Sequence, residues 1–545
     1  MNYAVPSLMW VLALFFQRPG TVVAVSASPN AATSQKDKLY LLTLLPYPDS
    51  KPTLQPSWPE GPSILPAIEL AVEHINNKTD ILAQYKLDLI NDNSGCNVVT
   101  KAYLSFIRNI FYETNSIVGT IGPGCSTSSL AISELTGNDE IALINFHLGG
   151  SLLLGNRAQY PYSFGMLASS YTFVETAYSL MLRNGWENVA ALYDPTRVFF
   201  QSTFSAFEED ITTAVPGSEI SFASFVSDSY LPLQEIRQSL VRVIFVFVGP
   251  EYARRIVCLA YHQNLFYPAY QWIIMGRAVS DFGNIEFRYE GTVVNCTRNM
   301  LVNVALRKSI LVNYKLLAED PNATTVSGFT SAEYRRMYEQ RVLEHNSMHS
   351  SSLMLVPTNW GAPLYDAVWA MALAMNKSLE TLEKRNLSLA NYHSGKPEIT
   401  YQILNETYSL DFRGVSGQIN FDTNSGFSSR FIDICQVVGG NEVHVANSFR
   451  GNITILRAVE FIKGSFTERA ITVELPLAMV FLIAIVVLLL AVTMTHTVST
   501  VYYKYRSIKE SSPKLNHLIY LGCYFLTAFT ILYITIKAFR RVTRL

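Results

Sequence analysis

The feature that most restricts the fold is a regular alternation of short apolar runs and amphipathic stretches between residues 38 and 460. Lys38–Leu45 has the composition of a buried strand, and the next stretch repeats apolar residues with helical spacing from Ile64 to Ile75. Strands that alternate with helices are typical of parallel α/β sheets. Because more than four hundred residues are too many for one sheet, the pattern predicts two lobes with a cleft between them.

The same reading places further elements along this region. The predicted strands are Tyr85–Ile90, Ser116–Gly122, Val189–Tyr193, Ile220–Phe225, Val243–Val248 and Gln271–Met275. The predicted helices include Val98–Thr114, Tyr171–Asn184, Phe199–Thr213 and Tyr252–Gln263. Ligands of such folds bind outside the carboxyl ends of the strands, so we expect a site there.

Three apolar segments lie outside the alternating region. The first, with small residues up to Ala27, predicts a signal peptide over residues 1–27. Leu475–Thr495 carries no charge and reaches about 30 Å as a helix, enough to cross a bilayer. Leu518–Ile536 is a second uncharged run. We therefore expect a ligand-binding region (38–460), a linker (461–474), two transmembrane helices (475–495 and 518–536), a loop (496–517) and a basic tail (537–545).

The charges predict the orientation of these segments. A translocated N-terminus places the basic loop 496–517 in the cytoplasm, as the positive-inside rule requires. The second span then leads back outward and leaves the basic tail on the unfavoured side. One explanation is that the natural chain continues beyond Leu545. The expected location is the plasma membrane with an extracellular N-terminus.

The charge balance excludes one class of partner. The chain has a formal net charge of -1, and the basic excess lies in residues 475–545. The rest is mildly acidic and offers no basic face large enough for a nucleic acid backbone, so nucleic acid is not an expected partner.

Sequons and cysteines indicate an oxidising compartment. Potential N-glycosylation sites, all in the region expected to be extracellular, are Asn77, Asn295, Asn322, Asn376, Asn386, Asn405 and Asn452. The six cysteines suit a large core with a few disulfides rather than a disulfide-built scaffold, and their spacing alone leaves the pairing open.

No catalytic or metal motif is present, so we expect neither an enzyme nor a cofactor or bound metal. The residues around Ser151 lack the spacing of a nucleophile elbow, and no phosphate-binding loop occurs. The pair His345 and His349 lacks the glutamate that a zinc protease places after the first histidine. A solvated polar helix is the simpler interpretation.

One stretch has the chemistry of a binding site. Gly122-Pro123-Gly124-Cys125-Ser126-Thr127-Ser128-Ser129 follows a predicted strand and opens a helix. Unpaired N–H groups, the positive end of the helix dipole and several hydroxyls converge there, which favours a carboxylate or phosphate. The alternative is that Ser126 or Thr127 simply caps the helix.

These segments together resemble the GABA type B receptors, class C G-protein-coupled receptors with a Venus-flytrap ectodomain. The resemblance runs from about Leu39 to Cys523. Its best local matches are Gly124-Cys125-Ser126, Arg254–Cys258 leading to Asn295-Cys296-Thr297, Ala362–Asn376, and Ser512–Leu518 ending in Gly522-Cys523. It implies a bilobal α/β fold of the type I periplasmic-binding-protein kind, with two parallel sheets followed by membrane helices.

The resemblance also implies a cysteine pattern. The ectodomain pairs would be Cys96–Cys125 and Cys258–Cys296, with Cys435 unpaired and Cys523 in the bilayer. Residues 436–522 contain no cysteine, which separates this chain from class C branches that carry a cysteine-rich module before the membrane.

Ligand contacts carry over only in part. Trp58 matches the family tryptophan that packs on the ligand, Ser126 matches the serine that holds its carboxylate, and Gly150-Ser151 match a second serine position. The departures are Trp360-Gly361 in place of the acid that receives the ligand amine, Leu167 for a histidine, Gly249 for a tyrosine and Arg277 for a tryptophan. An amine buried without its carboxylate would cost several kcal/mol, so GABA is not the expected ligand.

Asp194 is the one acid that can be placed near the cleft mouth, although an Asp-Pro turn explains it more simply. We therefore expect an anionic or amino-acid-like small ligand.

The family mechanism sets the functional expectation. A ligand closes the lobes, closure repacks a dimer with a homologous subunit, and seven membrane helices pass the change to a heterotrimeric G protein. With two spans, the 545-residue chain alone is expected to reach membranes without activating G proteins. Two alternatives stay open at this point, a membrane-anchored binding or decoy protein and a single-span receptor of the guanylate cyclase kind.

Overall fold

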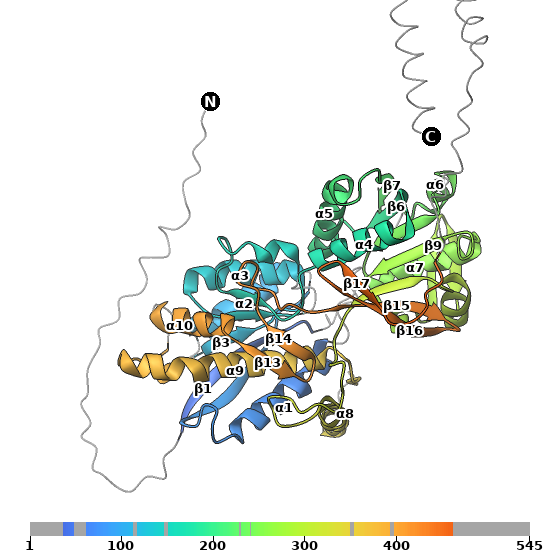
Figure 1. The fold of residues 1–545 in the computed structure, drawn as a ribbon. Helices are drawn as coiled ribbons and strands as arrows, with labels where there is room; N and C mark the ends of the chain where they lie inside the picture. Colours follow the sequence, from blue (N-terminus) through green and yellow to red (C-terminus); the bar gives the residue numbers. More distant parts are fainter. Residues whose placement is uncertain are drawn as a thin grey trace, which may run out of the picture.

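The computed structural model describes residues 36–461, apart from 48–60, 97, 113–116, 147–150, 228–229, 240, 349–353 and 393–396. This part forms two α/β lobes (Figure 1). Lobe one holds residues 36–166 and 317–428, and lobe two holds 167–316 and 429–461. The hydrophobic cores divide at the same positions, since Met166 lies in one core and Leu167 in the other. The predicted bilobal α/β fold is confirmed.

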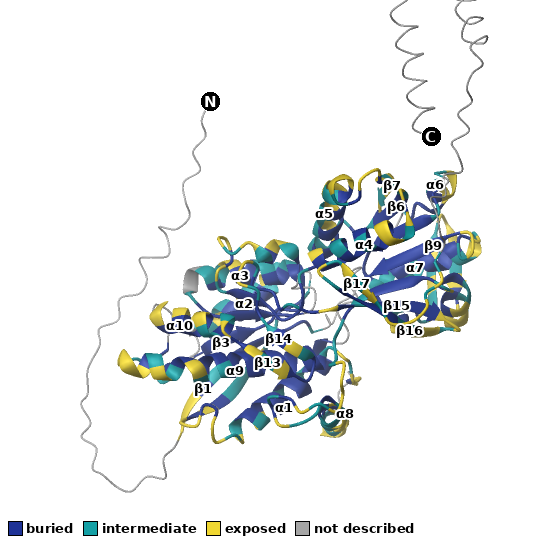
Figure 2. Cartoon of the chain, viewed as in Figure 1, coloured by how far each residue is buried: buried dark blue, intermediate teal, exposed yellow. Residues whose placement is uncertain are grey.

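Lobe one is built on a five-stranded parallel sheet with the order β2-β1-β3-β4-β5. Its strands are β1 (Asp37–Leu45), β2 (Tyr85–Asn93), β3 (Ile117–Ile121), β4 (Leu143–Asn145) and β5 (Ser163–Gly165). The apolar runs of β1, β3, β4 and β5 are buried on both faces, as parallel strands require, whereas the edge strand β2 is only partly buried (Figure 2).

Helices cover both faces of this sheet. They are η2 (Gly61–Ile64), α1 (Leu65–Asn76), α2 (Val99–Ile107), η3 (Arg108–Tyr112), α3 (Ser126–Asp139), η5 (Leu152–Gly155), α8 (Ser331–Met348), α9 (Gly361–Lys384), η8 (Leu389–Asn391) and α10 (Pro397–Tyr408). A hairpin of β13 (Asp411–Gly414) and β14 (Gly417–Asn420) completes the lobe. Helix α9 lies against α1 and α10, while α2 lies against α3.

Lobe two has an eight-stranded sheet with the order β17-β16-β15-β12-β9-β8-β6-β7. The strands are β6 (Asn188–Tyr193), β7 (Glu219–Phe225), β8 (Val243–Phe247), β9 (Gln271–Met275), β12 (Ile310–Tyr314), β15 (Ile432–Val438), β16 (Asn441–Phe449) and β17 (Asn452–Ile455). The first five are parallel, as predicted, and repeat the strand order of lobe one. The antiparallel strands β15 to β17 were not anticipated; short turns at Gly439-Gly440 and Gly451 join them, and turns this short cannot connect parallel strands.

The remaining elements of lobe two flank its sheet. They are α4 (Tyr171–Asn184), α5 (Val198–Ala214), α6 (Leu233–Gln238), α7 (Pro250–His262), η6 (Val279–Asp281), η7 (Met300–Ala305) and the hairpin of β10 (Ile285–Tyr289) and β11 (Thr292–Cys296). Helices α4 and α5 contribute to the core on one face, and α7 to the core on the other.

The chain passes between the lobes three times, after β5, after β12 and before β15. The first and third crossovers run side by side, because the Gly165 N–H donates to the Gly426 carbonyl (3.0 Å) and the Ser428 N–H donates to the Gly165 carbonyl (2.8 Å). A side chain at Gly165 would place its Cβ 2.0 Å from the Phe427 ring. Glycine is therefore required for these two segments to approach each other.

Two buried side chains of opposite charge, Asp366 and Arg430, fasten the third crossover to lobe one through Ser416. Asp366 on α9 accepts hydrogen bonds from the Val415 and Ser416 N–H groups at 2.9 and 2.7 Å. Arg430 donates to the Ser416 hydroxyl at 2.9 Å. Burial raises the pKa of Asp366 to about 6 and lowers the pKa of Arg430 to about 10, although each charge favours the other.

The last described residues are anchored to lobe two. Glu460 forms an ion pair with Lys308 (2.8 Å), and its carbonyl accepts a hydrogen bond from the Gln436 side chain (2.7 Å). The Phe461 ring packs edge-on against Trp186, with 5.7 Å between the ring centroids. The chain thus leaves the described region from lobe two.

The structure holds both disulfides that the resemblance implied. Cys96–Cys125 joins the loop after β2 to the start of α3, and Cys258–Cys296 joins α7 to β11. Cys435 is a free, buried cysteine, and burial raises the pKa of its thiol. Cys523 lies outside the described residues.

Six of the seven predicted glycosylation sites are exposed, the exception being Asn376. The Asn376 side chain accepts a hydrogen bond from the Leu82 N–H at 2.8 Å, and the hydroxyl of Ser378 in the same sequon is fully buried. The amide of Asn376 is thus committed to the fold. Glycosylation at all seven positions stays a prediction, and Asn376 is the least exposed of them.

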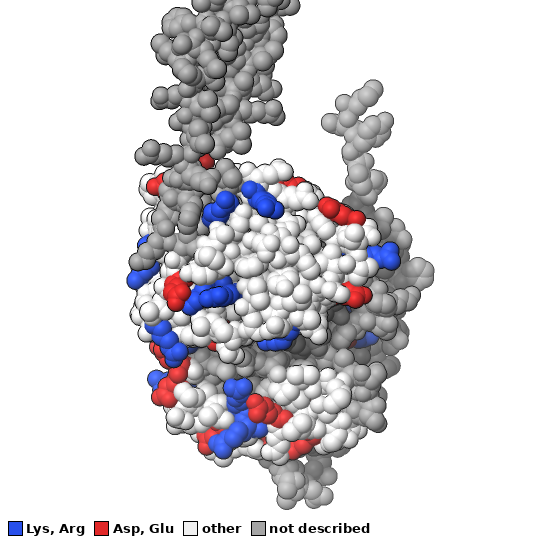
Figure 3. Space-filling model, turned by 90° about the vertical axis from the view of Figure 1, so that its right-hand side faces the viewer, with Lys and Arg blue, Asp and Glu red and all other residues white. Residues whose placement is uncertain are grey.

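Other predictions fall outside the described residues, namely the signal peptide, the linker beyond residue 461, both membrane spans, the loop between them and the basic tail. Among the described helices, none is long and apolar enough to span a bilayer. On the face seen in Figure 3, charged side chains of both signs are scattered without a large patch of one sign.

Candidate functional site: the sheet edges that face the cleft

The strand order of each sheet reverses next to its first strand, and ligands of doubly wound folds bind at this position. In lobe one it lies between the ends of β1 and β3. Gly122, directly after β3, has a φ of 95°, and a Cβ there would lie 2.3 Å from the Leu44 carbonyl oxygen of β1. Only glycine fits, so the loop that leads to α3 lies close against β1.

This loop places the start of α3 at the sheet edge. Two of its serine hydroxyls hold the loop together: Ser129 donates to the Pro123 carbonyl at 2.8 Å, and Ser128 donates to the Cys96 carbonyl at 3.2 Å. The disulfide at Cys125 adds a covalent anchor. The amide end of α3 is therefore fixed in place.

Ser126 is the first residue of α3 and is buried. The residue before the helix is Cys125, whose side chain makes no capping hydrogen bond. The alternative interpretation of Ser126 as the cap is therefore wrong, because the serine lies inside the first turn. Its position beside the positive end of the helix dipole is compatible with binding an anion.

Ser151 is the second predicted ligand residue that the structure describes. It is fully buried, directly precedes η5 and lies on the same side of the sheet as α3, since α3 contacts η5. Its hydroxyl lies 3.3 Å from that of Ser202 on α5, which belongs to lobe two. Trp58 and Gly150 lie outside the described residues.

In lobe two the equivalent edge lies between β6 and β8. Asp194 follows β6 and is fully buried; one oxygen accepts hydrogen bonds from the N–H (2.9 Å) and hydroxyl (2.6 Å) of Thr196. Its other oxygen lies 3.5 Å from the Arg197 Nε. The first oxygen stabilises the turn of Asp194 itself, as the simpler interpretation predicted, while the second is buried and has Arg197 as its charged neighbour without a hydrogen bond.

Arg197 was missed by the sequence analysis. A Cβ at Gly249 would lie 3.0 Å from the Arg197 guanidinium carbon. The arginine thus occupies the space beside the position where the family places a tyrosine. The only signal in the sequence was its position three residues after Asp194, a spacing that permits an ion pair within a turn.

Arg277, the second departure in lobe two, follows β9 and is buried. Its guanidinium lies 3.4 Å from Asp281 and 5.9 Å from the centre of the Phe200 ring on α5. The edge of lobe two therefore carries two arginines, each with an acidic neighbour, where the family has aromatic residues.

Trp360 directly precedes α9, where the family places the acid that receives the ligand amine. The half-buried side chain packs against the core of lobe one and also against the core of lobe two. An apolar contact between the lobes thus replaces a carboxylate. Leu167, where the family has a histidine, is buried in the core of lobe two.

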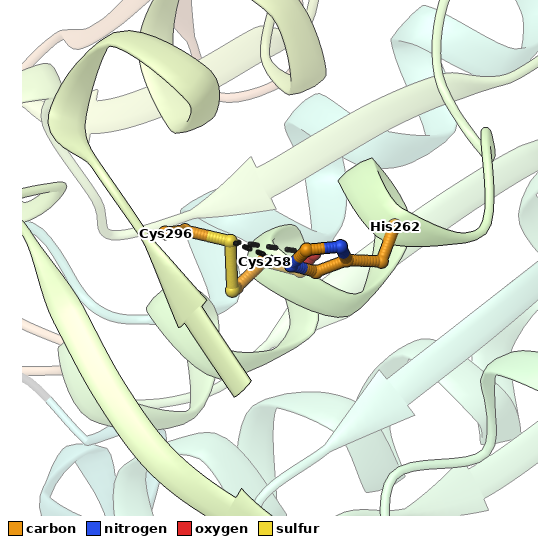
Figure 4. A group of neighbouring side chains, drawn as sticks. All are labelled: Cys258, His262 and Cys296. Atoms are coloured by element: carbon orange, nitrogen blue, oxygen red, sulfur yellow. Dashed lines mark hydrogen bonds between the residues drawn. A yellow bond between two sulfur atoms is a disulfide. The ribbon is translucent and has the colours of Figure 1, made fainter. Parts of the chain in front are cut away.

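A separate cluster lies away from this edge. Cys258, His262 and Cys296 form the one group within the described ranges that has three potential metal ligands close together (Figure 4). Both sulfurs belong to the disulfide, and the His262 Nε2 lies 3.5 Å from the Cys296 sulfur. Because a disulfide offers no thiolate, this cluster is not a metal site in the oxidised protein.

Comparison with known proteins agrees with this geometry. The family model "Receptor family ligand binding region" matches residues 63–439, and the chain belongs to that family. Among curated relatives, the chain is 27% identical to the mouse GABA type B receptor subunit 1 over 509 residues, which is 90% of this chain and 49% of the relative. The human subunit 2 is 25% identical over 477 residues, covering 85% and 48%, and the Caenorhabditis elegans subunit 1 is 24% identical, covering 86% and 51%.

The described region is therefore a receptor-family ligand-binding region, and it is similar to the corresponding part of GABA type B receptor subunits 1 and 2. The chain spans about half the length of the curated relatives it matches.

Proposed function

We propose that the chain is a cell-surface receptor subunit that senses a small extracellular ligand between its lobes. The observation that carries this proposal is the contact of α5 in lobe two with α3 and η5 in lobe one, beside the switch point of each sheet. Ligand binding would change the relative population of lobe arrangements. The family match supports a receptor rather than an enzyme.

The ligand we propose is a small carboxylate or another anion. Ser126 and the amide end of α3 favour negative charge. The family position for an amine-binding acid carries Trp360, and Asp194 is occupied by Thr196 and Arg197. A ligand amine would lose its hydration without gaining a carboxylate partner. GABA should therefore bind weakly or not at all.

A homologous subunit is the proposed partner, and a heterotrimeric G protein the proposed downstream target of a receptor with its full membrane domain. Similar proteins are named as receptor subunits 1 and 2. On lobe one, Leu104 and Phe111 expose 68% and 54% of their surface along α2 and η3. Large exposed apolar side chains are typical of association surfaces, so we place the subunit contact there.

The test is isothermal titration calorimetry on the purified full chain with acetate, glutarate and GABA. Replacing Ser126 by alanine should weaken carboxylate binding by roughly tenfold to a hundredfold, the effect of one lost hydrogen bond to a charged group. Ser133→Ala is the matched control, because that buried hydroxyl lies further along α3 and donates to the Ser163 hydroxyl at 3.1 Å. Tight GABA binding would contradict the amine argument, and carboxylate binding unchanged by Ser126→Ala would remove the proposed anion position.

A further inference from the structure

Two hydrogen bonds connect the lobes at the ligand loop. The Ser151 hydroxyl meets the Ser202 hydroxyl of α5 at 3.3 Å, and the Leu152 N–H donates to the Ser170 hydroxyl before α4 at 3.0 Å. Ser151 and Leu152 belong to lobe one, whereas α4 and α5 belong to lobe two. We call these four residues the clasp.

The lobe-two serines of the clasp stand at positions where a serine hydroxyl usually bonds to the backbone of its own helix. Ser170 is the residue before α4, where a serine hydroxyl usually caps its own helix. It makes no such cap here and accepts from Leu152 of the other lobe instead. Ser202 donates to the Phe199 carbonyl one turn earlier at 3.3 Å, which leaves its oxygen to accept from Ser151. Both lobe-two serines therefore act as acceptors for lobe one.

Burial strengthens the argument. Ser151 and Ser170 are fully buried, so these polar groups require partners, and separation of the lobes would have to replace them with water. Helix α5 also contacts η5 and α3 directly. The two lobes therefore touch over several residues here, and not through one side chain alone. Trp360 adds an apolar contact with both cores.

We propose that the clasp is a built-in substitute for part of the ligand: it holds α4 and α5 of lobe two onto the ligand loop of lobe one through the chain's own groups. The resemblance assigns the Ser151 hydroxyl to a ligand, but in this structure that hydroxyl bonds to Ser202 instead. Each bond biases the lobe arrangement by roughly two- to tenfold. A ligand must therefore bind beside the clasp, near Ser126, or displace it.

This inference rests on the proposed function, since Ser151 belongs to the same site, but its test does not use ligand binding. The experiment replaces Ser151 and Ser202 with cysteine (S151C/S202C) in the full chain expressed in cell membranes. The hydroxyl oxygens are 3.3 Å apart, and a disulfide needs its sulfurs at about 2.0 Å, a small approach. Free thiols are alkylated and the digest is mapped without reduction.

We expect the 151–202 disulfide in most molecules from washed membranes without added ligand. The matched control is S151C/S205C, which moves the second thiol by about 4.5 Å along α5 and should stay reduced. The native Cys96–Cys125 and Cys258–Cys296 bonds in the same digest verify folding. Free thiols at 151 and 202 beside intact native disulfides would overturn the clasp, as would a cross-link that forms only when GABA or glutarate is added.

A second measurement uses no new cysteine. Hydrogen exchange at the Leu152 amide should be slow, and Ser170→Ala should accelerate it roughly two- to tenfold. Ser169→Ala is the control, because that hydroxyl accepts only from Tyr171 within lobe two among the bonds described. Equal exchange at Leu152 in the parent and Ser170→Ala would also overturn the clasp. Failure of either test leaves the anion proposal at Ser126 standing.

Discussion

The two lobes have the same strand order around their switch points but build these sheet edges differently. Lobe one uses Gly122, a disulfide and serine hydroxyls to fix the start of α3. Lobe two uses charged side chains, with Arg197 beside Gly249 and Asp194 held in its own turn. The difference is that lobe one fixes its edge through the backbone and a covalent bond, whereas lobe two forms its edge with buried and half-buried charged side chains.

The largest contrast should come from the two glycines. Gly122→Ala would force a left-handed backbone and a Cβ 2.3 Å from a backbone oxygen, so we expect about 2–5 kcal/mol lost from the free energy of unfolding. Gly249→Ala meets only the mobile end of Arg197 and should cost under about 1 kcal/mol. Denaturant unfolding of both variants measures this, and equal losses would contradict the comparison.

Removing the disulfides one at a time should affect the free energy of unfolding in both cases but carboxylate binding in only one. Replacing either cysteine pair by alanine should cost about 3 kcal/mol, because the loops closed are of similar length, 29 and 38 residues. Only loss of Cys96–Cys125 should also weaken carboxylate binding, since that bond anchors α3. Calorimetry on both double variants tests this, and equal binding losses would show that the anchor in lobe one has no special role.

The buried pair behind the third crossover predicts a pH dependence. Burial raises the pKa of Asp366 to about 6, above its unfolded value near 3.8. The folded state therefore binds this proton more tightly, and its contribution is fully present below pH 3.8 and lost as the pH rises through about 6. The expected loss is about 3 kcal/mol.

Unfolding free energies measured from pH 4 to 7 check this, with Asp366→Asn as the comparison. That variant should be less stable at pH 4, because its NH2 group replaces one of the two oxygens that accept from the Val415 and Ser416 N–H groups. Its slope across this window should be smaller, because the amide does not ionise. An identical slope in the two proteins would exclude Asp366 as the titrating group.

The smallest expected effect restores a family feature. Trp360→Glu places a carboxylate where the family receives the ligand amine, and it should strengthen GABA binding by roughly tenfold relative to the parent chain. Trp360→Leu is the control, since it also loses the aromatic contact between the lobes. Equal GABA affinity in both variants would show that position 360 does not face the ligand.

Periodicity located most of the parallel strands, because buried strands have long apolar runs. Gln271–Met275 matches β9 at both ends, and the predicted Lys38–Leu45 differs from β1 by one residue. The β10–β11 and β13–β14 hairpins escaped this reasoning, since their strands are short and largely exposed. Long buried strands are apolar because they lie in the core, but short exposed strands have no apolar run that would identify them in the sequence.

The candidate site was predicted less completely than the fold. Ser126 could be located because a glycine-rich loop between a strand and a helix has a local signature. The partners of Ser151 and Leu152 could not, since Ser202 and Ser170 lie in another lobe and nothing local to them marks the contact. Arg197 and Trp360 contact residues that are distant in the sequence, Gly249 and the cores of both lobes. Such contacts leave no periodic pattern or motif in a single sequence.

The anchoring of residue 460 has a mechanical consequence. The ion pair with Lys308, the hydrogen bond from Gln436 and the edge-on packing of Phe461 on Trp186 tie the exit of the chain to lobe two. Any movement of lobe two as a rigid body would therefore also move the point at which the chain leaves the described region. A change at the clasp, which joins lobe two to lobe one, is in this way linked to residue 461 without any change inside lobe two.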